Sequence, residues 1–253
     1  IKMFKNFIHK IYTFLVYFNY YFSKKKFKKY IFIHPPQSGG NTIDYFFKIN
    51  FGLRNFKINN HLDFNIFDFS SKKLNKYFLV FGHFPYEFAF RSGYKKHFFY
   101  FTSIRNPRDR YLSNYFRNKK DFEKKGAKFM SLENFLKERI DQGLDNYYVR
   151  FFSSKKIYSN KSITVTEEHY IDSLENLKKL NFIFFLDEMN KYLKDFKKNF
   201  KLLFDMTIFF NLHKNRVSNS KYREITTEEN ELLYKLTFYD LKLYDAIKKF
   251  KLR

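Results

Sequence analysis

Short runs of apolar residues alternate along the chain with longer segments in which apolar residues recur at helical spacing. The continuous runs predict buried strands at residues 32–34, 77–81, 97–104 and 182–186. The periodic segments predict helices at residues 42–50, 107–119, 131–141, 144–152, 166–179, 189–204 and 227–250. Strands that alternate with helices usually pair in parallel. The pattern therefore predicts a three-layer α/β fold, with a mostly parallel central sheet flanked by helices.

The residues at the ends of the predicted helices and strands define some of their boundaries, whereas the segments between them have less regular patterns. Asn106 and Pro107 are typical of a helix cap and a first helical residue, so the helix at residues 107–119 has a well-defined start. Residues 51–76 are polar and irregular, and we expect a loop or a short helix there. Residues 119–128 are highly charged and are expected to be mobile. No repeat or linker divides residues 31–253, which we interpret as a single domain after an N-terminal segment of residues 1–30.

Residues 31–47 (IFIHPPQSGGNTIDYFF) have the pattern of a strand, a tight turn and a helix start. A chain that enters a helix through adjacent glycines points several N–H groups at one spot, and the helix dipole adds positive potential there. Such a turn suits a phosphate or sulfate oxygen. An ordinary strand–helix connection is the alternative at this stage.

Polar residues also follow the other predicted strands. His83 comes after the second strand, Arg105 after the third, with Ser113 two helical turns further on, and residues 213–221 form a basic loop. Ligands of parallel sheets bind beyond the carboxyl ends of the strands. His83 could serve as a base near neutral pH, and Arg105 as a phosphate clamp. The alternatives are a buried structural histidine, a structural salt bridge and a solvated loop.

The charge balance favours acidic partners. Lys and Arg number 49 against 25 Asp and Glu, a net charge of +24. Nucleic acid, anionic lipid, acidic glycans and nucleotide phosphates all fit this charge. Heavy use of Lys, Asn, Ile, Phe and Tyr is also what an AT-rich genome produces, so drift in composition is an alternative origin for part of the charge. The chain has no cysteine, which excludes disulfides and thiol chemistry.

The N-terminal segment combines aromatic and basic residues. Its apolar run at residues 11–22 is too short to span a bilayer and is flanked by lysines on both sides. This arrangement is typical of a helix that lies on an anionic membrane surface. A helix packed on the domain, followed by a solvated basic tail, is the alternative.

Two common chemistries find no support in the motifs. The turn at residues 35–42 lacks the Gly-Lys-Ser/Thr ending of a Walker loop, which disfavours ordinary nucleoside triphosphate hydrolysis. The seven histidines show neither an HxxxH nor an HExxH pattern, so we expect no metal.

Three segments resemble, in order and spacing, motifs of the sulfotransferases that use 3′-phosphoadenosine 5′-phosphosulfate (PAPS). The segments are FIHPPQSGGNT at residues 32–42, VFGHFPY at 80–86 and SIRNPRDRYLSNYF at 103–116. They are most similar to the carbohydrate group that includes heparan sulfate 2-O-sulfotransferase. Weaker similarity extends through residues 145–152, 182–196 and 212–222. The resemblance implies a P-loop-like fold and covers nearly the whole chain from residue 31.

The resemblance assigns roles to individual residues. His83 would be the catalytic base, PAPS the donor and 3′-phosphoadenosine 5′-phosphate (PAP) the product, without a metal. The loop at 212–222 would close over the nucleotide. The expected nucleotide-binding residues are Pro36, Gln37, Ser38, Gly39, Gly40, Asn41, Thr42, Arg105, Ser113, Lys214, Asn215 and Ser220.

Gln37 departs from the family pattern, because it stands where the family has a lysine that stabilises the leaving group. Glutamine can donate hydrogen bonds but brings no charge. Loss of one such cation commonly costs on the order of 2–4 kcal/mol in the transition state. Arg91, Lys95, Lys96 or the 213–221 loop could supply the missing charge.

We therefore predict a sulfotransferase that moves a sulfuryl group from PAPS to a carbohydrate hydroxyl, with His83 and Gln37 at the reacting centre. The acceptor is expected to be an acidic or lipid-linked glycan at the cytoplasmic face of the inner membrane. Its expected contacts are Arg91, Lys95, Lys96 and Arg150. A catalytically impaired PAP-binding protein is the main alternative. A nucleic-acid-binding protein is the weaker one, because no nucleic-acid-binding motif is present and the basic residues are spread along the chain.

Overall fold

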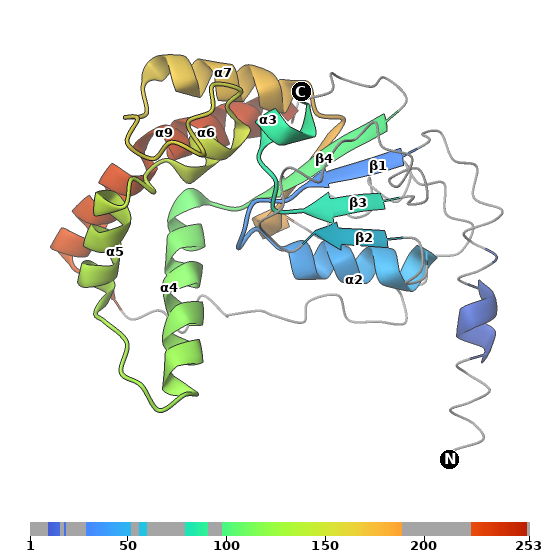
Figure 1. Ribbon diagram of the computed structural model, residues 1–253, viewed down its shortest axis with the longest axis horizontal. Helices are drawn as coiled ribbons and strands as arrows, with labels where there is room; N and C mark the ends of the chain where they lie inside the picture. Colours follow the sequence, from blue (N-terminus) through green and yellow to red (C-terminus); the bar gives the residue numbers. More distant parts are fainter. Residues whose placement is uncertain are drawn as a thin grey trace.

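The computed structural model describes residues 10–15, 18, 29–51, 56–59, 79–90, 98–188 and 224–251 (Figure 1). The predicted helix at residues 189–204 and the basic loop at 212–222 lie outside the described residues. All statements below concern the described part of the chain.

Five strands form one sheet, in the order β2-β3-β1-β4-β5, and every pairing in it is parallel. The expected α/β fold with a parallel central sheet is confirmed. The strands are β1 (Lys29–Ile33), β2 (Phe56–Asn59), β3 (Leu79–Gly82), β4 (Phe98–Ile104) and β5 (Phe182–Phe185).

Aromatic side chains build the centre of the sheet. Phe32 of β1 is in register with Phe81 of β3 and Phe101 of β4. The Phe32 ring stacks on both, with ring centres 5.0 Å and 4.7 Å apart. Stacked rings on neighbouring strands stabilise a sheet through cross-strand contact. The high aromatic content of the chain thus serves the core.

Helices cover both faces of the sheet. The helices are α2 (Gly40–Phe51), α3 (Tyr86–Ala89), α4 (Pro107–Glu123), α5 (Leu132–Asp141), α6 (Tyr147–Phe152), α7 (Glu167–Lys178) and α9 (Thr227–Lys251). Phe101 stacks on Phe47 of α2, and its neighbour Tyr100 stacks on Phe90, just after α3. Successive strand residues point to opposite faces, so α2 and α3 lie on opposite sides. Helix α9 packs against α4, α5, α6 and α7.

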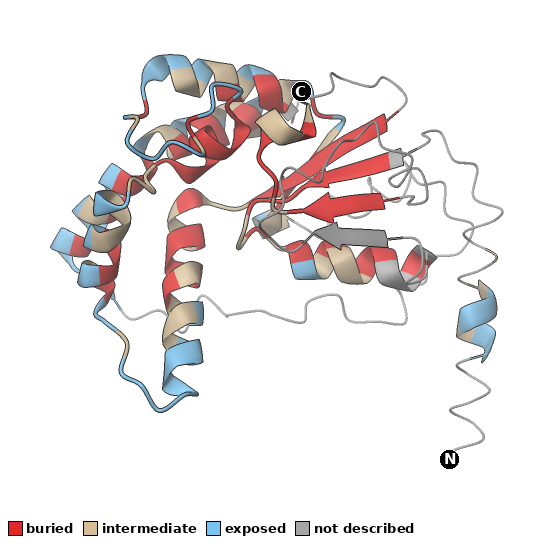
Figure 2. Cartoon of the chain, viewed as in Figure 1, coloured by how far each residue is buried: buried red, intermediate tan, exposed pale blue. Residues whose placement is uncertain are grey.

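Burial follows this layering. Figure 2 shows buried residues in β1 from Tyr30 on, throughout β3 and β4, and in the first half of α4, whose C-terminal end is exposed. The predicted start of α4 is confirmed, because the Asn106 side chain accepts hydrogen bonds from the backbone N–H groups of Arg108 (3.0 Å) and Asp109 (3.4 Å).

Two local expectations need correction, and one short helix is additional. Strand β2 lies where we expected a loop or short helix. It is four residues long and sits at the sheet edge, so its backbone pairing with β3 decides its structure more than any apolar pattern. Helix α4 continues to Glu123, into the charged segment expected to be mobile, with a Lys119–Glu123 ion pair one turn apart (3.9 Å). The four-residue helix α3 was not expected.

The strand order has a topological switch point at the carboxyl ends of β1 and β4. The chain leaves β1 toward β2, which lies on one side of β1, and leaves β4 toward β5 on the other side. Adjacent strands whose connections diverge in this way leave an opening, where ligands of open parallel sheets bind. The turn after β1 and the start of α4 follow these two strand ends.

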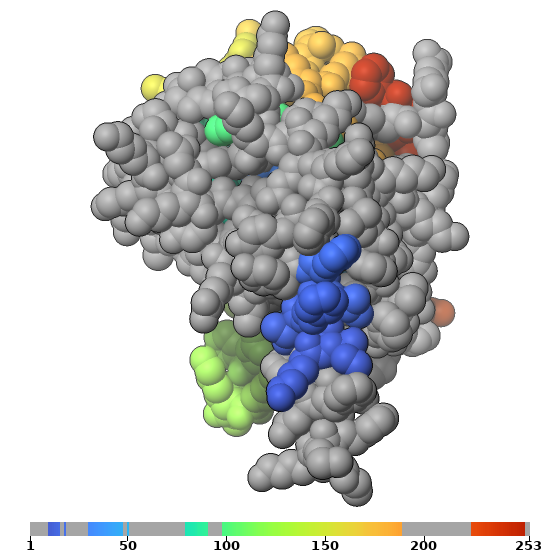
Figure 3. All heavy atoms as spheres, turned by 90° about the vertical axis from the view of Figure 1, so that its right-hand side faces the viewer, coloured from blue at the N-terminus to red at the C-terminus, as the bar shows by residue number. Residues whose placement is uncertain are grey.

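The N-terminal segment is helical at residues 10–15 and lies on the outside of the molecule (Figure 3). Ile11 and Phe14 are 44% and 64% exposed. Within the described part of the chain, no helix is both long enough and apolar enough to cross a membrane.

Candidate active site

The turn between β1 and α2 has the geometry of an anion cradle. Gln37 and Gly39 both have positive φ angles, 65° and 87°. The Gly39 carbonyl accepts hydrogen bonds from the N–H groups of Thr42 (3.0 Å) and Ile43 (3.3 Å), which closes the first helical turn. Helix geometry leaves the earliest N–H groups without an intrahelical acceptor. Those of Gly40 and Asn41 are therefore available at the positive end of α2.

His34, the last residue before the turn, is the centre of this arrangement. Its ring stacks on Phe32 (5.1 Å between ring centres) and Phe81 (5.2 Å) and is 5% exposed. The first atom of a side chain at position 40 would lie 1.8 Å from the His34 Nε2, so only glycine fits there. Burial, and then the charge of His83, hold the pKa of His34 well below its ordinary value. His34 is therefore a neutral packing residue under the turn.

Sequence reasoning assigned no role to His34. A lone histidine after an apolar run is more often a core residue than a functional one. The contact that matters is with Gly40, six residues later and across the turn.

Ser38 differs in part from our expectation. The residue is completely buried, and its hydroxyl donates to the Pro35 carbonyl and lies 3.3 Å from the Ser103 hydroxyl oxygen. The hydroxyl thus ties the turn to β4 instead of facing a ligand. We correct its role accordingly: the side chain is structural, and only the backbone N–H of Ser38 remains part of the candidate site.

His83 follows β3 and lies beside His34, with ring centres 4.6 Å apart. Its Nδ1 is 2.9 Å from the His34 carbonyl oxygen. A carbonyl only accepts hydrogen bonds, so Nδ1 carries the proton, and the lone pair of the neutral ring is on Nε2. The His34 N–H in turn donates to the Gly82 carbonyl (3.0 Å), which fixes the two strand ends against each other.

Arg105 is the first residue after β4, the other neighbour of β1. Its backbone N–H donates to the Tyr148 hydroxyl (3.0 Å), and the Thr102 hydroxyl donates to the Ile33 carbonyl (2.6 Å). Neighbouring strands lie about 5 Å apart, so the turn, His83 and Arg105 occur at three adjacent strand ends. Ser113 is buried on the face of α4 that also carries Arg110.

Arg110 is a site residue that sequence reasoning missed. It is 3% exposed, its Nε donates to the Pro36 carbonyl (3.2 Å), and its guanidinium carbon lies 3.5 Å from the ring centre of Tyr147. The sequence signal was present, because Arg110 belongs to the IRNPRDR segment.

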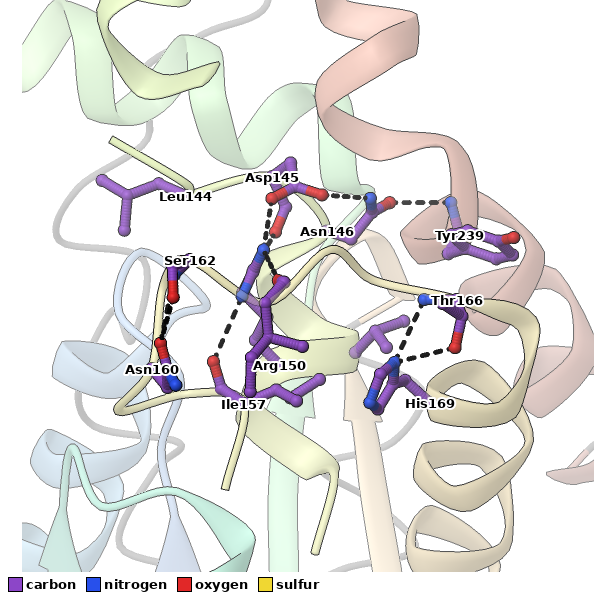
Figure 4. A network of polar contacts seen from close by, with 12 residues as sticks. Leu144, Asp145, Asn146, Arg150, Ile157, Asn160, Ser162, Thr166, His169 and Tyr239 are labelled. Carbon is purple, nitrogen blue, oxygen red and sulfur yellow. Dashed lines mark hydrogen bonds and ion pairs between the residues drawn. The ribbon is translucent and has the colours of Figure 1, made fainter. Parts of the chain in front are cut away.

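Arg150 has a structural role, which corrects the expectation that it contacts an acceptor. It is 3% exposed and donates four hydrogen bonds (Figure 4). Two go to the carbonyls of Ile157 (3.2 Å) and Ile163 (2.9 Å). The other two go to the backbone oxygen (2.9 Å) and carboxylate (2.6 Å) of Asp145. These contacts hold the chain around α6 and leave no exposed surface for a glycan.

Helix α6 presents tyrosines to Arg105 and Arg110, and α9 holds α6 in place. The Asp240 carboxylate of α9 accepts the N–H groups of Tyr148 (3.0 Å) and Val149 (2.9 Å) at the start of α6. The Asn146 N–H donates to the Leu236 carbonyl (2.7 Å), and its side-chain oxygen accepts the Tyr239 N–H (2.7 Å; Figure 4). Burial raises the pKa of Asp240 to about 7, although these backbone N–H groups favour the carboxylate.

The remaining expected contacts lie outside the described residues. They are Arg91, Lys95, Lys96, Lys214, Asn215 and Ser220. Among the residues that are described, no three or more His, Asp and Glu side chains are grouped to hold a metal ion.

No protein-family profile matches this chain, and no curated protein is significantly similar to it in sequence.

Proposed function

We propose that this protein is a sulfotransferase that moves a sulfuryl group from PAPS to a carbohydrate hydroxyl. One observation carries the proposal: the N–H-lined turn after β1 lies directly beside His83, whose Nδ1 is committed to the His34 carbonyl. An anion cradle next to an oriented imidazole is what transfer of an anionic group to a hydroxyl requires.

In this proposal the N–H groups of residues 38–41 and the α2 dipole hold the 5′-phosphosulfate, with the Thr42 hydroxyl beside them. Arg105 and Ser113 hold the 3′-phosphate. His83 Nε2 accepts the proton of the acceptor hydroxyl as its oxygen forms a bond to sulfur. The bond between sulfur and the bridging phosphate oxygen breaks, and PAP leaves with that electron pair. The chemistry depends on positioning and charge stabilisation.

The acceptor is proposed from the sequence resemblance and from the charge of the chain. A net charge of +24 favours an acidic glycan. The exposed Ile11 and Phe14, with lysines on either side of their segment, support contact with an anionic membrane surface. A lipid-linked glycan at the cytoplasmic face would bring donor, acceptor and protein together.

Isothermal titration with PAP tests the nucleotide site. We expect the wild type to bind PAP, and Arg105→Ala to weaken binding at least about tenfold, because a charge-assisted contact to phosphate is lost. Arg117→Ala, on the exposed part of α4, is the matched control for loss of one positive charge. Absence of PAP binding by the wild type, or equal binding by Arg105→Ala, would contradict the site.

A catalytically impaired PAP-binding protein is the second candidate, and Gln37 favours it. Gln37 is half-buried in the turn, with a left-handed backbone and an uncharged side chain. In that case PAP would bind with the same dependence on Arg105, but no sulfuryl group would be transferred.

A further inference from the structure

Arg110 carries a buried charge that the fold does not fully satisfy. Its Nη1 is buried without a hydrogen-bond partner, and its Nε bonds to the Pro36 carbonyl. Arg150, equally buried at 3% exposed, donates four hydrogen bonds. A buried guanidinium with an unmet donor costs stability. Stability of the fold alone therefore explains Arg150 but not Arg110.

The bond from Arg110 Nε to the Pro36 carbonyl lies at a sensitive point of the turn. The Pro36 carbonyl belongs to the peptide unit directly before Gln37, the residue with φ of 65°. Holding this oxygen fixes the plane of the peptide on one side of the left-handed residue. The directions of the following N–H groups, from Ser38 onward, depend on that plane.

Tyr147 supplies the surface on which the guanidinium rests. Its ring lies 3.5 Å from the Arg110 guanidinium carbon, and its hydroxyl is 3.1 Å from the Tyr158 hydroxyl. The flat face of an arginine packs well on an aromatic ring. The stack orients the side chain, so that Nε points to Pro36.

We propose that Arg110 is a positioning residue: its Nε–H holds the Pro36 carbonyl and so keeps the turn at residues 36–40 in its anion-binding form. The inference rests on the proposed function, because it concerns the 5′ part of the same nucleotide site. It adds a residue that acts on the ligand through the backbone of the turn.

Three substitutions separate the hydrogen bond from the charge. In Arg110→Gln the amide nitrogen takes the place of Nε, so the donor remains and the charge is lost. In Arg110→Lys a methylene takes the place of Nε, so the charge remains and the donor at the Nε position is lost. Arg110→Met loses both and keeps the length of the stem. Arg117→Met, on the exposed part of α4, controls for loss of charge alone.

Titration with PAP, adenosine 3′-monophosphate and adenosine 5′-monophosphate measures each phosphate separately. The affinity ratio of PAP to the 3′-monophosphate reports the 5′ phosphate, and the ratio to the 5′-monophosphate reports the 3′ phosphate. We expect Arg110→Lys and Arg110→Met to reduce the 5′ ratio at least about tenfold, as small misplacements in a site commonly do. Arg110→Gln should stay within about threefold, and the 3′ ratio should change little in all three.

The opposite ranking, in which Lys preserves the 5′ ratio and Gln does not, would overturn the inference in favour of a charge effect. Equal losses in both ratios would overturn it in favour of a general structural role. If Arg110→Met does not fold, the comparison of Gln with Lys decides the same question. Failure of the proposed function would be visible earlier, because the wild type itself would not bind PAP.

Discussion

The carbonyl oxygen of His34 lies 2.9 Å from the Nδ1 of His83 and thereby selects the tautomer of the second histidine. Because this contact uses a backbone atom, it depends on the position of the strand end and not on the His34 side chain. The same residue supports the turn with its ring. The candidate base and the candidate anion cradle are thus joined by one amino acid.

The orientation of His83 leads to the first prediction. His83→Asn places its amide nitrogen near the position of Nδ1 and keeps a donor for the His34 carbonyl, but it offers no basic nitrogen. We expect sulfuryl transfer to fall by about two to four orders of magnitude, as for loss of a general base, with PAP affinity changed less than about twofold. Transfer assays with labelled PAPS and titration with PAP would measure both. Retained turnover in this variant would remove His83 from the role of base.

The contact between His34 and Gly40 leads to the second prediction. A methyl group at position 40 would lie 1.8 Å from His34 Nε2, inside a packed core. We expect Gly40→Ala to destabilise the fold by about 1–3 kcal/mol, the usual range for overpacking, and to weaken PAP binding. Urea unfolding and titration with PAP would measure the two effects.

Two further variants test the cause. Gly126→Ala is the control for a glycine-to-alanine change without a clash. Alanine is unfavourable at Gly126 because of its φ of 74°, but an added Cβ there would have no atom within 4 Å. In a protein that already carries His34→Ala, Gly40→Ala should reduce the free energy of unfolding by less than it does in the wild type. We expect the difference to exceed about 1 kcal/mol, because the clashing ring is absent. Additive losses in the two variants would show that the clash is not the cause.

Signals confined to one stretch of sequence were enough to predict much of this fold. The strands β1, β3, β4 and β5 are continuous apolar runs, and the cap at Asn106 depends on residues within one helical turn. Strand β2 escaped prediction because its partner β3 lies some twenty residues away and supplies the pairing. An edge strand of four residues carries little pattern of its own.

The candidate site was predicted less completely, because its decisive contacts join distant segments. Arg110 and Tyr147 are far apart in sequence and meet only because α9 holds α6 beside α4. Arg150 was misassigned for the opposite reason. A positive charge in a sequence indicates a partner, but only the fold shows that its partner is Asp145, inside the protein.

The buried Asp240 leads to the third prediction, on the pH dependence of stability. Burial raises its pKa from the ordinary 3.8 to about 7, so between these values the folded protein holds a proton that the unfolded chain releases. The contribution of Asp240 to stability therefore decreases as the pH rises from about 4 to 7, by at most about 1.4 kcal/mol per pH unit. Asp240→Asn removes this dependence.

The measurement is urea unfolding of both proteins from pH 5 to 8. Asp240→Asn should be less stable than the wild type at pH 5, since the amide cannot accept both N–H groups that the carboxyl group accepts. The difference in free energy of unfolding between the two proteins should become smaller as the pH rises. Other titrating groups, His34 among them, are present in both proteins and cancel in the difference. Asp141→Asn, an exposed carboxylate on α5, is the control. A difference that is constant with pH would contradict the raised pKa.

Gln37 leads to the last prediction, which separates an active enzyme from an impaired one. Gln37→Lys places a cation beside the proposed bridging oxygen. Both residues have a Cβ, so the φ of 65° is equally unfavourable for the lysine and the glutamine. If the turn binds phosphosulfate, we expect transfer to rise by about ten- to a hundredfold, the effect of one well-placed charge in a transition state. The affinity for PAP should rise as well, because PAP is the leaving group and its 5′ phosphate carries the charge that the lysine stabilises.

Gln37→Gly is the matched variant. It relieves the left-handed strain, which costs an L residue about 1 kcal/mol, and it adds no charge. It should therefore change stability but not raise transfer. A wild type without measurable transfer, together with an active Gln37→Lys, would identify a PAP-binding protein that has lost its cation. If neither the wild type nor Gln37→Lys transfers a sulfuryl group, although both bind PAP, the missing charge is not what limits the chemistry.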